Sequence, residues 1–289
     1  MHNGFGYSYL ILFINFTHMN FTFTTLLLLL LSFSSCSQTT KVKIPEKIVY
    51  DFSCMETDEF SSFISFGSDL EKDLLSVLGV PVSVKEEMEV GDSTIAQLRT
   101  EENLIESGSD YTRVKGLLAK LTSHIKKPKG FTYQIFLLNS AEINAFTVGG
   151  KIFFTTAMID FCKSDDEIAC IIGHEIAHNE LGHINEGISR LKTAGRFGEI
   201  GQISSAVASL ATTSFNQKNE AHSDFIGIDL AYAAGYNGCA SAELWIRMKT
   251  QEGDHTGIDT FFSSHPFSEK REACVKHHID SNYAVNCGN

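Results

Sequence analysis

The residues of this sequence best suited to chemistry are two histidines four positions apart, the first followed directly by a glutamate. They lie in residues 174–178, HEIAH. Residues four apart share one face of a helix, so His174 and His178 can bind one metal ion. Glu175, beside that metal, can take a proton from water and pass it to a leaving amine. The motif predicts zinc-dependent peptide hydrolysis; the alternative is a surface helix that carries these residues by chance.

The residues around this motif predict a mostly buried helix that begins near Ser164. Ser164 is a candidate N-cap, and the three acidic residues 165–167 suit the partial positive charge of a helix N-terminus. The motif is surrounded by apolar residues, namely Ile168, Ile171, Ile172, Ile176 and Leu181. Polar side chains are costly in such surroundings unless they are paired or bind a metal, which favours the metal-site interpretation.

A third zinc ligand must come from elsewhere, and the first candidate is a histidine just after the motif. The pattern H-E-x-x-H-x-x-G-x-x-H would supply one, but here His183 comes one position too early. On a continuous helix His183 would lie about 180° from His174 around the axis. We therefore expect His183 to face away from the metal.

The second candidate is a carboxylate on a later helix. Glu220 and Asp224 are four residues apart and share one helical face. We expect Glu220 to be the third ligand and Asp224 to accept a hydrogen bond from a ligating imidazole, which fixes its tautomer. The alternative is an acidic, solvated helix. His222 should point to the other side of this helix, as a surface histidine.

Three separated segments of the chain resemble motifs of one known family. Residues 144–152, NAFTVGGKI, are similar to its N-A-F-x-x-x-G-G-x-I strand, residues 174–178 to its metal helix, and residues 220–224 to its E-x-x-x-D. They resemble the HtpX and CAAX prenyl endopeptidase family of zinc metallopeptidases, the gluzincins, and within it the soluble periplasmic lipoproteins. Ser223 stands where this family prefers alanine. The resemblance implies an α+β, mainly helical, zincin-like domain that binds one zinc ion per chain.

A fourth segment, Ser264-His265-Pro266 followed by Arg271, is similar to the family's T-H-P loop. The resemblance implies that His265 lines the active-site cleft. In some relatives a histidine from such a loop approaches the zinc as a removable extra ligand. The alternative is a histidine that caps a C-terminal helix, and both interpretations stay open.

Two short apolar segments, residues 133–138 and 151–155, are expected to form strands. They are joined through Asn144 to Gly150, whose paired glycines predict a hairpin. An exposed edge strand beside the metal helix could pair with an extended peptide through main-chain hydrogen bonds. The resemblance implies that this edge, with Asn144, Ala145 and Phe146, lines the substrate groove; the alternative is an ordinary core hairpin.

The amino end predicts export. No Lys or Arg precedes Lys41, and residues 21–33 are nearly continuous in Leu, Phe and Thr. This run is shorter than the ~20 residues of a spanning helix. It closes on residues 33–36, FSSC, similar to a bacterial lipobox, so we expect residues 1–35 to be a signal peptide and Cys36 to be acylated and tethered to a membrane. The true start is Met1 or Met19; the alternatives are a soluble secreted enzyme or an uncleaved anchor.

The remaining chain is expected to contain a tether and N-terminal segment, residues 36–90, and one metallopeptidase domain, residues 91–289. Hydrophobic spacing and turn residues predict the other helices. The expected helices are 69–78, 101–125 packed behind the hairpin, 217–234, 240–250 and 268–280. The Gly-, Ala- and Ser-rich residues 186–215 form either a mobile lid or a pair of packed helices.

Charge and cysteine content narrow the class of protein further. The net charge of −12 disfavours nucleic acid as a partner, and the first 40 residues contribute none of it. Beyond Cys36 six cysteines remain, an even number that permits disulfides in an exported chain. Their pairing is open, and Cys162 and Cys170 could equally be buried thiols.

Together these features predict a membrane-tethered zinc endopeptidase of the bacterial envelope. Its substrates are expected to be unfolded or misassembled proteins, in a quality-control role. The competing hypothesis is an autoinhibited or non-cleaving factor that binds client proteins on the same fold.

Overall fold

The computed structural model describes residues 42–55, 80–101, 103–193, 217–250, 258–266 and 269–288. Cys36, the signal peptide, the helix expected at residues 69–78 and most of the segment 186–215 lie outside these residues. The helices formed by the described residues include none that is both long and apolar enough to cross a bilayer.

A four-stranded sheet stands at the centre of the fold, in the strand order β1-β2-β4-β3. β2 and β4 are parallel, whereas β3 pairs antiparallel with β4 and β1 antiparallel with β2. β3 is therefore an outer strand. The strands are β1 (Leu104–Ile105), β2 (Gln134–Leu138), β3 (Ala145–Val148) and β4 (Lys151–Thr155).

The predicted hairpin between residues 133–138 and 151–155 is wrong. The segment expected to be its loop forms a strand of its own, β3, so the chain reverses direction twice and β2 and β4 run parallel. The hairpin is formed by β3 and β4, joined by Gly149 and Gly150. Both glycines have positive φ angles, +57° and +77°, a conformation that side chains with a Cβ rarely adopt.

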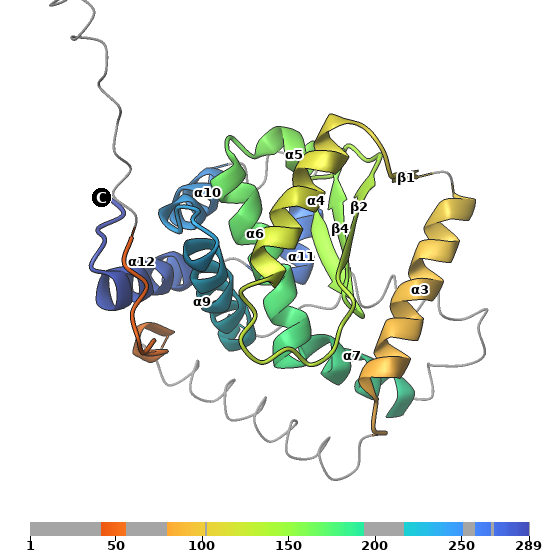
Figure 1. The fold of residues 1–289 in the computed structure, drawn as a ribbon, viewed down its shortest axis with the longest axis horizontal. Helices are drawn as coiled ribbons and strands as arrows, with labels where there is room; N and C mark the ends of the chain where they lie inside the picture. The colour runs from red at the N-terminus through yellow and green to blue at the C-terminus, as the bar shows by residue number, and fades with distance from the viewer. Residues whose placement is uncertain are drawn as a thin grey trace, which may run out of the picture. The chain divides into compact units, whose positions relative to one another are not determined.

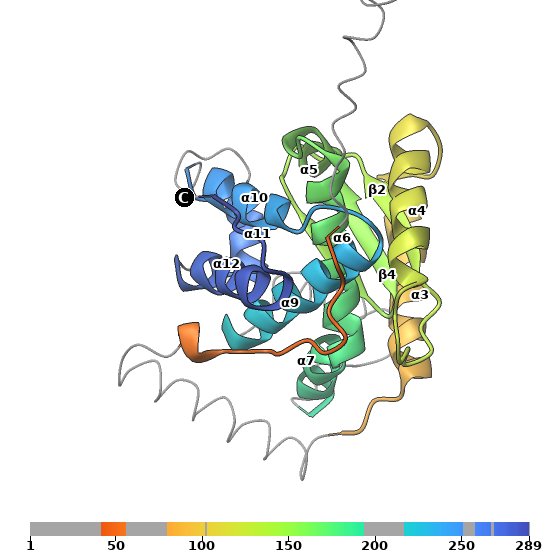
Figure 2. The same ribbon diagram turned by 60° about the vertical axis from the view of Figure 1, so that its left-hand side comes forward.

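Helices cover both faces of the sheet and build a second layer beyond it. In Figures 1 and 2 the sheet lies between α6 and α3, and α9, α10 and α12 stack on the far side of α6. One apolar cluster joins α4 and α6 to one sheet face, and a second joins α3 and α7 to the other. The helices are α3 (Val84–Thr100), α4 (Ser109–Thr122), α5 (Thr156–Phe161), α6 (Asp165–Leu181), α7 (His183–Thr193), α9 (Gln217–Ala233), α10 (Cys239–Lys249), α11 (Asp259–Ser264) and α12 (Glu269–Tyr283).

The predicted start of the motif helix is confirmed. Ser164 is the N-cap of α6 and its hydroxyl accepts a hydrogen bond from the Glu167 N–H. The helices expected at 217–234, 240–250 and 268–280 are also confirmed, as α9, α10 and α12. The helix expected at 101–125 is shorter: it begins at Ser109, because Leu104 and Ile105 belong to strand β1.

Two disulfides tie the amino-terminal and carboxy-terminal segments to the helical layer. Cys54, in the short 3-10 helix η1 (Ser53–Met55), is bonded to Cys274 of α12, and Cys239 is bonded to Cys287. The Tyr50 hydroxyl adds a hydrogen bond to Asp229 of α9, 2.9 Å long. The two remaining cysteines of the described residues, Cys162 and Cys170, are buried thiols.

One buried carboxyl group gives the fold a predicted pH dependence. Glu87 of α3 is 1% exposed, and its Oε2 accepts a hydrogen bond from Asn185 of α7. Burial raises the Glu87 pKa from 4.5 to about 7. Between these values the folded protein holds a proton that the unfolded chain releases, so stability falls as the pH rises through this window.

We therefore expect Glu87→Gln to be more stable than wild type at pH 8, by roughly 1–3 kcal/mol, and to lose this advantage near pH 4.5. Urea unfolding at both pH values measures the difference. Glu89→Gln, on the exposed side of the same helix, is the control and should show no such pH-dependent gain. An equal response of both variants would contradict the assignment.

Candidate metal centre

Close packing of α6 against α9 positions the candidate site. Gly173 of α6 faces Gly227 of α9, and a Cβ added to Gly173 would lie only 2.7 Å from the Gly227 carbonyl oxygen. The two backbones are therefore in direct contact. This crossing brings His174 and His178, one turn apart on α6, against Glu220 of α9.

Four buried side chains converge at this crossing: His174, His178, Glu220 and His265. Their donor atoms lie within 4.8 Å of one another. The Nε2 atoms of His174 and His178 are 2.9 Å apart, and the Glu220 carboxylate is 3.2 Å from His178 Nε2 and 3.4 Å from that of His174. His265 Nδ1 lies 3.1 Å from Glu220 Oε2. The structure thus brings together the three predicted ligands and the predicted loop histidine.

The chemistry of these donors fits a zinc ion. Imidazole nitrogens and a carboxylate oxygen are the donors that zinc prefers, and three protein ligands are usual where zinc is catalytic. Glu220 Oε1 is fully buried and accepts no well-aligned hydrogen bond among the described residues; its polar neighbour is His178 Nε2, 3.2 Å away. A cation bound between these two atoms would satisfy both of them. These residues would therefore hold zinc.

Asp224 lies against one of the histidines. Its Oδ1 lies 2.9 Å from His174 Nδ1, on the side of the ring opposite the donor cluster. This contact favours the tautomer with a proton on Nδ1 and leaves Nε2 free to bind a metal. Burial raises the Asp224 pKa, but the charge of Arg271 and the hydrogen bond with His174 outweigh it, and the net pKa is lowered.

Arg271 is a part of the site that the sequence interpretation did not assign. It is fully buried, and its guanidinium group bonds both Asp224 oxygens at 2.9 Å. It also lies 3.0 Å from Glu220 Oε2 and stacks over Trp245, 4.1 Å from the ring centre. The signal for it was indirect: three carboxylates, those of Glu175, Glu220 and Asp224, are expected beside one doubly charged metal ion, which leaves a negative charge to be compensated.

The expectation that His183 faces away from the metal site needs correction. It assumed a continuous helix, but Gly182 adopts a left-handed conformation, with φ of 88°, and ends α6. His183 therefore begins α7, and its Nδ1 lies 3.1 Å from Nδ1 of His178. His183 is not part of the donor cluster. It contacts the Nδ1 side of the His178 ring, whereas Nε2 faces the cluster, and the Ser223 hydroxyl lies 3.4 Å from His183 Nδ1.

Glu175, the predicted general base, lies on the same helix and is 1% exposed. Its Oε1 has no hydrogen-bond partner among the described residues and is 3.6 Å from Nε2 of His265. Burial raises the Glu175 pKa. His222 points to the opposite side of α9, as expected, but is half-buried against the rings of Tyr50 and Phe52 rather than at the surface.

The predicted substrate strand lies beside the metal helix. Asn179 of α6 accepts a hydrogen bond from the Gly150 N–H and donates one to the Thr147 hydroxyl, which fixes the β3–β4 hairpin. Asn144 and Ala145 are buried, and Phe146 is half-buried and stacked on Phe153. One side of β3 pairs with β4, so its other side is the outer edge of the sheet that the described residues form.

Known proteins with similar sequences include metallopeptidases. The chain is 29% identical over 158 residues to mitochondrial metalloendopeptidase OMA1 of Arabidopsis thaliana, which covers 52% of this chain and 32% of that protein. It is 27% identical over 226 residues to the beta-barrel assembly-enhancing protease of Escherichia coli K12, covering 71% and 46%. Metalloprotease LoiP of the same organism is 22% identical over 202 residues, covering 65% and 78%. The chain thus spans about a third to a half of the length of the first two.

A family model, Peptidase family M48, matches residues 111–279, more than half of the chain. The matched region contains all four residues of the donor cluster as well as Glu175 and Asp224. The predicted fold class, family resemblance and zinc cofactor are thereby confirmed. On the match and on the geometry of its metal centre, the chain belongs to peptidase family M48.

Proposed function

We propose that this chain is a zinc-dependent endopeptidase that hydrolyses peptide bonds in unfolded or misassembled proteins. The observation that carries the proposal is the buried convergence of His174, His178 and Glu220 with Glu175 beside them. The names of the relatives, a metalloendopeptidase and two proteases, support the same activity.

The side chains of the site divide the chemistry among them. Zinc held by His174, His178 and Glu220 would supply Lewis-acid polarisation of the scissile carbonyl group. Glu175 accepts a proton from the attacking water and delivers it to the amine nitrogen as the peptide bond breaks. Asp224 holds the His174 ring in the tautomer whose Nε2 faces the cluster. His183 Nδ1 does the same for His178 by accepting a hydrogen bond from its Nδ1–H.

The outer edge of β3 is proposed to hold the substrate. A peptide in extended conformation would add to this edge through main-chain hydrogen bonds near Asn144, Ala145 and Phe146. Because backbone groups rather than pockets would make these contacts, side-chain selectivity should be low. This suits substrates that are recognised by being unfolded rather than by sequence.

The proposed location is the bacterial cell envelope, with residues 1–35 removed and Cys36 carrying a lipid that tethers the enzyme to a membrane. The disulfides Cys54–Cys274 and Cys239–Cys287 support an oxidising compartment. Secretion without a lipid is the alternative. Mass spectrometry of the protein purified from a bacterial membrane fraction would distinguish a diacylglycerol-modified Cys36 from an unmodified amino end.

The activity can be tested on the full chain with an unfolded, reduced protein as substrate. We expect one zinc ion per chain, cleavage of the substrate, loss of cleavage after chelation and recovery on adding zinc. Folded protein that binds no zinc would overturn the proposal. Zinc binding without cleavage would favour the second candidate function, a client-binding factor, for which the position of His265 inside the donor cluster is the supporting observation.

His265→Ala tests whether this histidine restrains the enzyme. The ring is 1% exposed and lies between Glu220 and Glu175, where a substrate carbonyl and water would have to enter. We expect the variant to keep its zinc, since three ligands remain, and to cleave unfolded protein several-fold faster. Zinc content by atomic absorption and initial cleavage rates measure both effects; loss of zinc with loss of activity would instead make His265 a required ligand.

A further inference from the structure

Strand β2 has a free edge on the side opposite the proposed substrate strand. The Gln134 N–H bonds the Gly150 carbonyl, towards β4, whereas the Asn139 N–H bonds the Asn103 carbonyl, towards β1. Backbone groups of a strand alternate in direction, so those of Ile135 and Leu137 also point towards β1. β1 pairs only with Leu137 and Leu138, because the chain then leaves to begin α4. Within the described residues, no strand therefore stands opposite Ile135 on this side.

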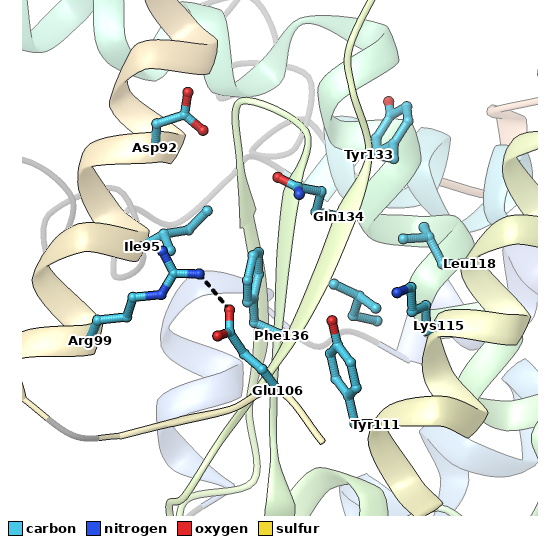
Figure 3. A pocket seen from close by; sticks show the side chains of 11 residues that line it. Asp92, Ile95, Arg99, Glu106, Tyr111, Lys115, Leu118, Tyr133, Gln134 and Phe136 are labelled. Carbon is cyan, nitrogen blue, oxygen red and sulfur yellow. Dashed lines mark hydrogen bonds and ion pairs between the residues drawn. The ribbon is translucent and has the colours of Figure 1, made fainter. Parts of the chain in front are cut away.

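A cavity of about 420 Å³ lies along this free edge, between α3 and α4. Figure 3 shows Gln134 and Phe136 directed towards the α3 wall, which carries Asp92, Ile95 and Arg99. Tyr111, Lys115 and Leu118 line the opposite wall, on α4. The volume falls within the range of sites that bind small ligands or short peptide segments.

The charges of this cavity are matched within the protein. Arg99 is paired with Glu106 at 2.7 Å, and Asp92 with the buried Lys151 at 3.1 Å. The Lys115 ammonium group lies over the Tyr111 ring, 5.7 Å from its centre. A nucleotide or another multiply charged ligand would have to break these pairs, and it would find no excess of opposite charge in the cavity. An uncharged segment with apolar side chains and main-chain donors and acceptors matches the cavity better.

We propose that this cavity is a second peptide-binding site, in which an extended, uncharged polypeptide segment adds antiparallel to β2 and continues the β1 ladder. Its main chain would exchange two hydrogen bonds with Ile135. Residues directly opposite in an antiparallel pair point to the same face. The residue opposite Ile135 would thus meet Tyr111 and Leu118, and its neighbour opposite Phe136 would meet Ile95. An uncharged segment of an unfolded protein that presents apolar groups to both faces has this chemistry.

The site would hold a substrate at a second point, away from the outer edge of β3. β2 is separated from β3 by β4, so one sheet would present two edges to the same unfolded chain. Binding at two linked points raises the effective concentration of the second segment. The inference goes beyond the proposed peptidase activity, and its test does not depend on cleavage.

Hydrogen exchange of the full-length Glu175→Gln protein, loaded with zinc, tests the inference with a capped eight-residue peptide of alternating leucine and threonine. At saturating peptide we expect exchange of the Ile135 amide to slow at least tenfold. The Phe136 amide, which is directed at β4, serves as an internal control and should not change. No protection at Ile135, or protection confined to the β3 amides at residues 145–148, would overturn the proposal.

Lys115→Trp and Lys120→Trp form a matched pair, because both residues are exposed on α4 and only Lys115 lines the cavity. The Lys115→Trp ring should fill the cavity and abolish the protection of Ile135, whereas Lys120→Trp should leave it intact. Protection that survives in Lys115→Trp would place the peptide elsewhere and refute the site.

Discussion

Replacing Glu175 with glutamine is expected to reduce the rate of peptide cleavage by roughly 100- to 10,000-fold while zinc stays bound. Glutamine has nearly the same size and shape, but its amide cannot accept the proton that the attacking water must lose. Glu175 lies outside the four-residue donor cluster, so metal binding should persist. Steady-state cleavage of an unfolded protein, together with zinc content, measures both halves of this expectation.

Glu180→Gln is the matched control for Glu175→Gln. Glu180 lies five residues later on the same helix and accepts hydrogen bonds from the Tyr133 hydroxyl and the Lys129 N–H, away from the donor cluster. Its replacement should leave the cleavage rate within about twofold of wild type. A Glu175→Gln protein that still turns over at the wild-type rate would remove Glu175 as the base, and one that loses zinc would move Glu175 into the ligand set.

Arg271→Met is expected to give the largest loss of stability, about 3–5 kcal/mol in the zinc-free protein. The side chain is fully buried and pairs with the buried carboxylates of Glu220 and Asp224. Removing the guanidinium group leaves two buried carboxylates with histidine contacts but no permanent positive charge. The resulting loss of stability exceeds the stability that the ion pairs themselves contribute. Zinc should recover part of the loss, because a bound cation restores positive charge beside Glu220. Urea unfolding with and without chelator measures the two values.

Arg113→Met provides the contrast, since Arg113 pairs with Asp165 where both side chains are substantially exposed. Exposed pairs contribute about 0–1 kcal/mol, so this variant should unfold almost like wild type. Arg271→Lys should fall between the two, because an ammonium group restores the charge but not the two-pronged contact with Asp224. A loss below about 1 kcal/mol for Arg271→Met would contradict the assigned role.

The donors of the candidate site could be predicted from the sequence because each is set by local spacing. His174 and His178 are one turn apart on a helix that Ser164 begins, and Glu220 and Asp224 are one turn apart on another. Helical periodicity alone places each pair on one face.

Partners that meet through tertiary packing could not be predicted in this way. Arg271 lies 47 positions after Asp224, and no periodicity links them. His183 was misplaced because a single left-handed residue, Gly182, redirects the chain. The hairpin was misassigned because a four-residue strand can be hidden in a segment that looks like a loop.

Helix α3 was not predicted from the sequence, for a different reason. Its buried face includes Glu87, Gly91 and Thr94 besides Val90 and Ile95, so the apolar pattern that marks an amphipathic helix is interrupted. Gly91 is needed there because a Cβ would lie 2.6 Å from the Val148 carbonyl oxygen. Gly91 thus allows the helix to pack closely against the sheet, and it also interrupts the apolar pattern by which a helix is predicted.

The backbone contact between Gly173 and Gly227 limits how this metal centre can be redesigned. No side chain separates the two helices at that point, so no larger or smaller residue can tune the distance between the histidines of one helix and the glutamate of the other. Substitutions at this contact therefore cannot be used to change the metal preference of the site. Selectivity would have to be altered by exchanging the donor atoms themselves, for example a thiolate for the carboxylate at Glu220.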